Sequence, residues 1–172
     1  MPLAQAVHHA GLVLLHPFLP RFFESTAVKA AGEPALLTGE LPRAAALLHL
    51  LATGDQEPFE LDLGFIKVLL GLPIDAQLPI SEGLVPASDR EEVDALLAAV
   101  IDHWSALKRT SVSGLRASFL QRHGLLREDD QGFRLQVEPA PFDMLLGQLP
   151  WGIGTIKLPW MKKLLFTDWP AP

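Results

Sequence analysis

The side chains that could hold a metal ion in this chain are chiefly its six histidines, and their spacing argues against such a site. They are His8, His9, His16, His49, His103 and His123. No two stand in an HxxxH or HExxH pattern, so a metal site would have to be assembled from distant segments. His8 and His9 lie near the N-terminus, where exposed residues are common. The sequence therefore predicts no metal-binding residue.

Nucleophilic and cofactor chemistry also lack their usual patterns. The chain has no cysteine and no G-x-S-x-G motif. The hydroxyl-rich run at residues 110–114 is better explained as a helix N-cap, because Ser and Thr side chains accept hydrogen bonds from free N–H groups there. Gly152 and Gly154 lack the third glycine of a dinucleotide loop, and no P-loop motif occurs. We expect no catalytic residue, no cofactor-binding residue, no cofactor and no enzymatic activity.

Composition and charge describe a globular chain with an acidic first part. The 172 residues are 49% apolar and 20% charged, which fits a single domain over residues 1–172, with candidate sub-lobes at 1–87 (helical) and 88–172 (helix-helix-hairpin). Net charge is −6, made of −9 over residues 1–106 and +3 over 107–172; an ordinary solvated surface explains this spread best. The basic residues cluster no further than pairs, and no apolar run reaches the about 20 residues that a membrane span needs. We therefore expect no nucleic-acid binding and no membrane insertion.

Apolar periodicity and helix-end signals predict a mainly helical chain. Helices are expected at residues 10–23 (kinked by proline), 42–52, 58–70, 89–108 and 112–123. Pro42 suits a first helical turn and Gly54 a helix end. Ser88 and Glu91 fit a capping box before the helix at 89–108. The helix at 58–70 is expected to bury one apolar face, formed by Leu61, Phe65, Ile66 and Leu69.

The last third of the chain predicts β-structure. Residues 125–137 fit a β-hairpin with a polar turn at 128–132, and the return strand alternates apolar with polar residues. A short helix is expected at 141–149, followed by one or two short strands within 152–169. The predicted fold class is therefore α+β, mainly α: a compact helical domain with a β-hairpin and short C-terminal strands, compatible with a winged-helix-like unit.

The segment at residues 149–161 is unusual because it combines glycine, proline and tryptophan. Tryptophan is enriched both in cores and at interface hot spots, so the segment either completes the core, which we favour, or forms a docking surface. A docking surface would use strand addition along residues 155–158. The candidate protein-interface residues are Trp151, Ile153, Ile156, Lys157, Leu158 and Trp160.

Several stretches of the chain resemble the C-terminal region of tape measure proteins from contractile injection systems, which are phage-tail-like particles. The matching stretches are AGLVLLHPFLPR (10–21), LLHLLATG (47–54), residues 67–73, HWSALK (103–108), TSV (110–112), GLR (114–116), LPWGI (149–153) and TIKLPWM (155–161). The resemblance carries over no catalytic residue, and it implies asparagine where this chain has His9. Members of the family are usually much longer, and this chain lacks a segment that could act as a ruler.

What the resemblance implies is a structural, non-enzymatic role: a domain that anchors to the tube, spike, baseplate or cap of a particle and contributes to tube-length control. Its partners would be protein components of that particle. The resemblance leaves open whether the chain also forms a homo-oligomer. It would be located in the bacterial cytoplasm during assembly and then within the particle. The alternative is a small regulatory or chaperone-like binding module outside any particle, which the neighbouring genes would distinguish. A hydrolase has no nucleophile constellation to support it.

Overall fold

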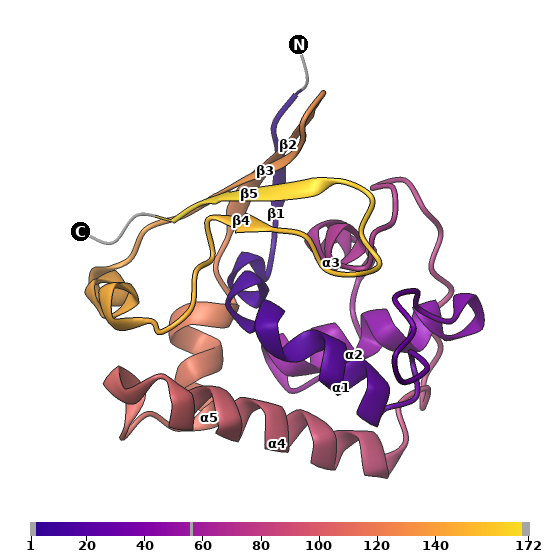
Figure 1. The fold of residues 1–172 in the computed structure, drawn as a ribbon, viewed down its shortest axis with the longest axis horizontal. Helices are drawn as coiled ribbons and strands as arrows, with labels where there is room; N and C mark the ends of the chain where they lie inside the picture. Colours follow the sequence, from indigo (N-terminus) through magenta and orange to yellow (C-terminus); the bar gives the residue numbers. More distant parts are fainter. Residues whose placement is uncertain (1–2, 56, 170–172) are drawn as a thin grey trace.

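The computed structural model describes residues 3–55 and 57–169, so the two ends of the predicted domain, residues 1–2 and 170–172, lie outside the described residues. A twisted sheet lies on one side of the molecule, and the helices pack beneath it (Figure 1). The fold is α+β with a helical majority, as predicted. No helix within the described residues is both long and apolar enough to cross a membrane.

The helical elements fall into α-helices and shorter 3₁₀ or π turns. The α-helices are α1 (Leu19–Ser25), α2 (Leu41–Thr53), α3 (Gly64–Leu69), α4 (Ala87–His103) and α5 (Val112–Leu115). The 3₁₀ helices are η1 (Ala10–Phe18), η2 (Thr38–Glu40), η3 (Glu60–Asp62), η4 (Ser105–Leu107) and η6 (Pro141–Gln148), and η5 (Arg116–Leu120) is a π turn.

Helix α2 begins and ends as its sequence predicts. Pro42 lies in the first turn, where its missing N–H costs no hydrogen bond. Gly54 ends the helix in the left-handed conformation, with φ of 83°, and its N–H donates to the Leu50 carbonyl. Every residue from Ala44 to Ala52 is buried, so α2 runs through the middle of the core. The N-cap predicted near residue 111 is also confirmed, because the Ser111 hydroxyl accepts from the Gly114 N–H at 3.0 Å.

Two helix predictions were wrong at their N-terminal ends. Ser88 does not cap α4; the extended Pro86 is the N-cap, which places Ser88 inside the first turn. Residues 58–70 are not one helix but η3 followed by α3. The break at Leu63 removes the periodicity that placed Leu61 inward, and Leu61 is 81% exposed.

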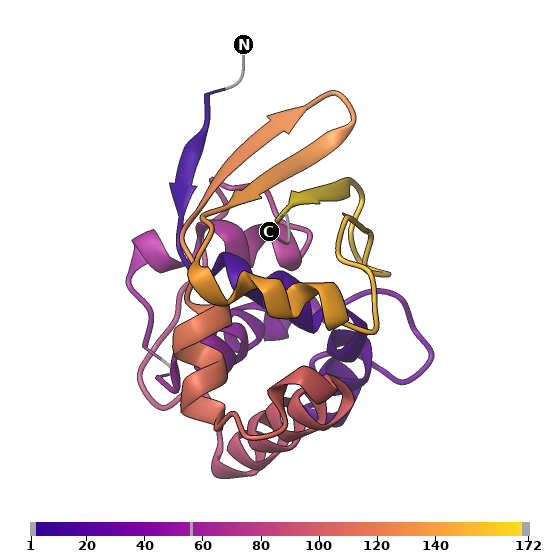
Figure 2. The same cartoon turned by 90° about the vertical axis from the view of Figure 1, so that its left-hand side faces the viewer.

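The sheet of the described residues has five strands in the order β1-β2-β3-β5-β4. The strands are β1 (Gln5–Val7), β2 (Gly124–Asp129), β3 (Gly132–Val137), β4 (Thr155–Ile156) and β5 (Leu164–Asp168). The hairpin β2–β3 projects from the body (Figure 2) and has the predicted alternation, with Phe133, Leu135 and Val137 buried. Strand β5 runs parallel to β3, and the unpredicted β1 pairs antiparallel with β2. This pairing brings the N-terminal segment against the last third of the chain.

One hydrophobic cluster joins the helices to the inner face of the sheet. The closest backbone approach is at Gly11 in η1, where an added Cβ would lie 1.7 Å from the Phe119 carbonyl oxygen of η5. Glycine is therefore required there by space. A buried ion pair joins Arg122, which precedes β2, to Asp143 of η6.

Candidate functional site

The six candidate interface residues lie in one short segment and are buried to different degrees. Ile156 and Leu158 are buried, at 2% and 3% exposure, whereas Lys157 between them is exposed. Trp151, Ile153 and Trp160 are partly buried and pack against the hydrophobic core. The segment therefore contributes apolar side chains to the core while one of its sides stays accessible.

Both indole groups of this segment are fixed by hydrogen bonds to distant helices. The Trp151 Nε1–H donates to the Leu14 carbonyl of η1 at 2.9 Å, and the Trp160 Nε1–H donates to the Leu69 carbonyl of α3 at 2.7 Å. Gly71 follows α3 with φ of 75°, and an added Cβ would lie 2.9 Å from the Trp160 carbonyl oxygen. These contacts hold the segment rigidly on the helical layer.

Strand β4 in this segment forms an edge of the sheet. Thr155 is paired with Phe166 of β5, and the Thr167 N–H donates to the preceding Gly154 carbonyl at 2.9 Å. Bonded and non-bonded pairs alternate along antiparallel strands, so Thr155 takes a non-bonded position. Its backbone N–H and C=O consequently point away from β5, towards the open edge.

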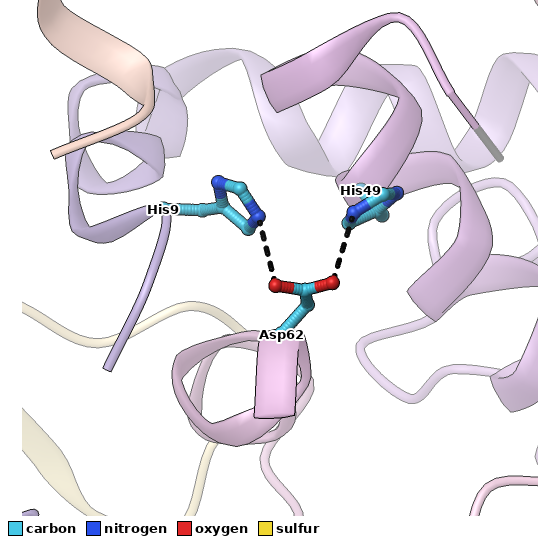
Figure 3. A group of neighbouring side chains, drawn as sticks. All are labelled: His9, His49 and Asp62. Atoms are coloured by element: carbon cyan, nitrogen blue, oxygen red, sulfur yellow. Dashed lines mark ion pairs between the residues drawn. The ribbon is translucent and has the colours of Figure 1, made fainter. Parts of the chain in front are cut away.

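A second group of polar residues was not predicted as a site. His9 at the start of η1, His49 in α2 and Asp62 in η3 point towards one another from three separate segments (Figure 3). The expectation that the N-terminal histidines are exposed is wrong for His9, which is 8% exposed. The pairing of β1 with β2 draws this part of the chain into the interior.

The carboxylate of Asp62 lies between the two imidazoles. Its Oδ1 is 3.7 Å from His9 Nε2, and its Oδ2 is 3.7 Å from His49 Nε2. The same carboxylate accepts hydrogen bonds at 3.0 Å from His8 Nδ1 and from the Phe59 N–H. At 3.7 Å the inner imidazoles are too distant for hydrogen bonds.

His9 is a buried polar side chain without a hydrogen bond. Neither ring nitrogen has a hydrogen-bond partner among the residues that the structure describes. Burial lowers the pKa of His9 to about 4, with His49 adding to the lowering and Asp62 opposing it. His9 is therefore a neutral imidazole near neutral pH. Its backbone has φ of 58°, a left-handed conformation that asparagine adopts more readily than most residues, which suits the asparagine implied for this position.

His49 and Asp62 are each oriented by a further hydrogen bond. The His49 Nδ1–H donates to the Asp55 carbonyl at 2.6 Å, which leaves the lone pair of a neutral ring on Nε2, facing Asp62. Burial alone would raise the pKa of Asp62, but the hydrogen bonds from His8 and the Phe59 N–H hold it below its ordinary value. Asp62 is thus an anion facing two imidazole nitrogens.

The sequence gives one local signal for this group, the lone histidine within the leucine-rich stretch of α2. Of the other histidines, His123 stacks on His8 with ring centroids 4.8 Å apart, and His103 is exposed at the end of α4. His16 donates from Nε2 to the Gly152 carbonyl at 2.7 Å and so helps to fasten the C-terminal segment.

Comparison with known proteins gives one family. Residues 3–169 match the family described as contractile injection system tape measure protein, which covers both groups of residues above. No curated protein and no solved structure matches the chain.

Proposed function

Because the chain belongs to the contractile injection system tape measure protein family, we propose that it is a structural assembly component that anchors to the tube, cap or baseplate of an injection particle and contributes to tube-length control. Assembly takes place in the bacterial cytoplasm, and the protein then stays within the particle. The observation that carries this proposal is the family match, which extends over nearly the whole chain from residue 3 to residue 169.

The shape of the domain supports anchoring more than measuring. The longest helix in the described part of the chain, α4, has 17 residues, and at about 1.5 Å per residue it is only about 25 Å long. The helices fold back on one another around one core (Figure 1). Such a domain suits a fixed attachment point, and a ruler requires an extended segment.

The docking element that we propose is the open edge of β4 with its flanking residues Ile153 and Lys157. Edge strands carry backbone donors and acceptors that pair readily with an added strand. The indole hydrogen bonds of Trp151 and Trp160 hold this edge in place, so an arriving strand would meet a preorganised template. The partner is a particle protein that supplies an extended segment.

Deletion of the gene in the producing bacterium tests the assembly role. We expect particles to be absent or to have abnormal tube lengths in electron micrographs, with recovery when the intact gene is returned. Purified particles should contain this polypeptide. Normal tubes in the deletion strain, or particles without the polypeptide, would contradict the proposal.

The edge itself is tested by Thr155→Pro, which removes the outward-pointing N–H while leaving the bonds to β5 in place. Thr155→Val is the matched control, because it keeps the N–H and changes only the side chain. We expect the proline variant to fold but to fail in restoring particles, and the valine variant to restore them. Ile156→Lys is a poorer test, because Ile156 is 2% exposed and a lysine there would unfold the domain. Full assembly by the proline variant would exclude the edge.

A further inference from the structure

The side chains of His9, His49 and Asp62 place three good metal ligands around one point. Their ligand atoms all lie within 4.8 Å of one another (Figure 3). Ligands at about 2.0–2.2 Å from a tetrahedral zinc ion lie roughly 3.3–3.6 Å from each other. The two contacts of 3.7 Å from Asp62 to the imidazoles are close to this spacing. A small inward movement of the side chains would complete it.

The hydrogen bonds around the three side chains are incomplete, and a bound cation would explain this better than a network made of protein groups alone. The ring nitrogens of His9 are themselves buried and have no hydrogen-bond partner among the described residues, and the residue as a whole is 8% exposed. Buried polar atoms are normally paired, and an orphan needs an explanation. A metal ion bound to Nε2 would supply one of the two missing partners, and Nδ1 would keep none among the described residues.

Behind two of the three ligands, His49 and Asp62, the protein groups have the arrangement expected of an outer shell. Metal-ligating histidines usually donate their other ring N–H to a carbonyl or carboxylate, which fixes the tautomer. His49 does this through its hydrogen bond to the Asp55 carbonyl. Asp62 is held by donors from His8 and the Phe59 N–H, so its remaining lone pairs face the imidazoles.

We propose that His9, His49 and Asp62 bind one divalent transition-metal ion of the Zn²⁺ class, with water in the fourth position. Imidazole nitrogen selects zinc and its neighbours over Mg²⁺ and Ca²⁺, which prefer ligand sets made of oxygen alone. One carboxylate offsets part of the charge of the ion. The ion joins the β1–η1 junction to helix α2 and the 3₁₀ helix η3, which both lie much later in the sequence. Its role is a structural tether at the base of the N-terminal strand.

The binding experiment uses the full chain without a polyhistidine tag, stripped of metal with a chelator and then dialysed. Calorimetric titration with ZnCl₂ should give one saturable site per chain, and thermal unfolding with excess Zn²⁺ should show a Tm several degrees higher than with chelator. Titration with Co²⁺ should produce the visible absorption bands of a four-coordinate ion.

Variants assign the site to its ligands. His9→Asn removes the imidazole while keeping a residue that tolerates the left-handed backbone, and Asp62→Asn keeps the shape of the side chain. Each should weaken Zn²⁺ binding by more than about a hundredfold, beyond the loss typical of outer-shell changes. His103→Gln is the matched control, since His103 is an exposed histidine outside the group; it should bind like the unchanged protein. Far-UV circular dichroism without metal checks that each variant is folded.

Each outcome decides the proposal. Single-site binding that is lost in His9→Asn or Asp62→Asn and kept in His103→Gln supports it. Absence of saturable binding by the unchanged protein, or equal binding by a folded ligand variant, overturns it. Should one ligand variant not fold, the other gives the same decision.

Discussion

Two carboxylates of this protein, Asp143 and Asp62, lie in polar groups of opposite kind. Asp143 is 1% exposed and accepts from both terminal nitrogens of Arg122, from the Ala140 N–H at 2.9 Å and from the Trp169 indole at 3.1 Å. Burial would raise the pKa of Asp143, but the hydrogen bonds from Arg122, Ala140 and Trp169 hold it below its ordinary value. Both oxygens of the Asp143 carboxylate therefore accept hydrogen bonds.

Asp62 has fewer partners, and they are weaker. Two donors hold the carboxylate, whereas the imidazoles of His9 and His49 face it at 3.7 Å without hydrogen bonds. The guanidinium of Arg122 is enclosed by aromatic rings, those of Phe119, Phe142 and Trp169; His9 has orphan nitrogens instead. The first group is complete without any further partner, whereas the second lacks the partner that the proposed metal ion would supply.

The largest expected effect comes from breaking the first group. Asp143→Ala leaves the Arg122 charge buried and unpaired, so it should lower the free energy of unfolding by about 3–5 kcal/mol. Urea unfolding followed by circular dichroism measures this loss. Glu128→Ala is the control, because it breaks an exposed ion pair, the one with Lys163, and should cost clearly less. Equal costs for the two variants would show that burial of Asp143 has no consequence.

Zinc should produce the next largest effect, and it should depend on the second group alone. At a free Zn²⁺ concentration about 100 times the Kd, binding to the folded state adds roughly 2.7 kcal/mol of stability. The same increment is expected in Asp143→Ala, provided that it still folds, and is expected to vanish in His9→Asn. Urea titrations with zinc and with chelator give both numbers. A zinc increment that survives in His9→Asn would place the ion elsewhere.

Protonation of Asp143 in acid should destabilise the protein less than Asp143→Ala does, because the protonated side chain still fills its space. The unfolded carboxyl titrates near 3.8 and the folded one lower, so the unfolded state binds more protons in this range and stability falls as pH falls. The stabilisation from Asp143 is complete above about pH 5, and it is lost progressively as pH falls from about 4 through the lowered folded pKa. Comparing Tm at about pH 5 and about pH 3.5 should show a shallower loss in Asp143→Asn than in the unchanged protein. An equal fall in Tm for the two proteins would show that Asp143 is not the source of this acid sensitivity.

The sequence predicted best those features that are encoded locally. The alternation of Phe133, Leu135 and Val137 is enough to define the hairpin, and Gly54 marks the end of α2 through its own backbone preference. Each of these signals lies within a few residues of the feature that it predicts. The α+β class followed from such signals added together.

The features that were missed depend on contacts across the sequence. The misplaced N-cap is the exception, because it is local: Ser88 is a good N-cap residue, but the chain is already helical from Ala87 and the extended Pro86 is the N-cap. The burial of His9 results from β1 pairing with β2 more than a hundred residues later, and nothing near His9 encodes this. His49 and Asp62 reach it only through the packing of α2 and η3, so no spacing motif could have revealed the three together.

The smallest expected effect is also the most discriminating one: Asp62→Asn in the absence of metal. The asparagine oxygen can still accept from the Phe59 N–H, and His9 is neutral because its pKa is lowered to about 4. His9 is therefore not a buried cation that would lose its partner, and the free energy of unfolding should change by no more than about 1 kcal/mol.

The isosteric change Asp143→Asn is the matched comparison, because it neutralises the partner of the buried Arg122 and should cost clearly more. Urea unfolding of both variants in chelator measures the contrast. If Asp62→Asn cost as much as Asp143→Asn, the two imidazoles would be charged partners of Asp62 and the group would be a structural ion-pair network. A small cost at Asp62 together with lost zinc binding would mean that this carboxylate is placed for the ion rather than for the fold.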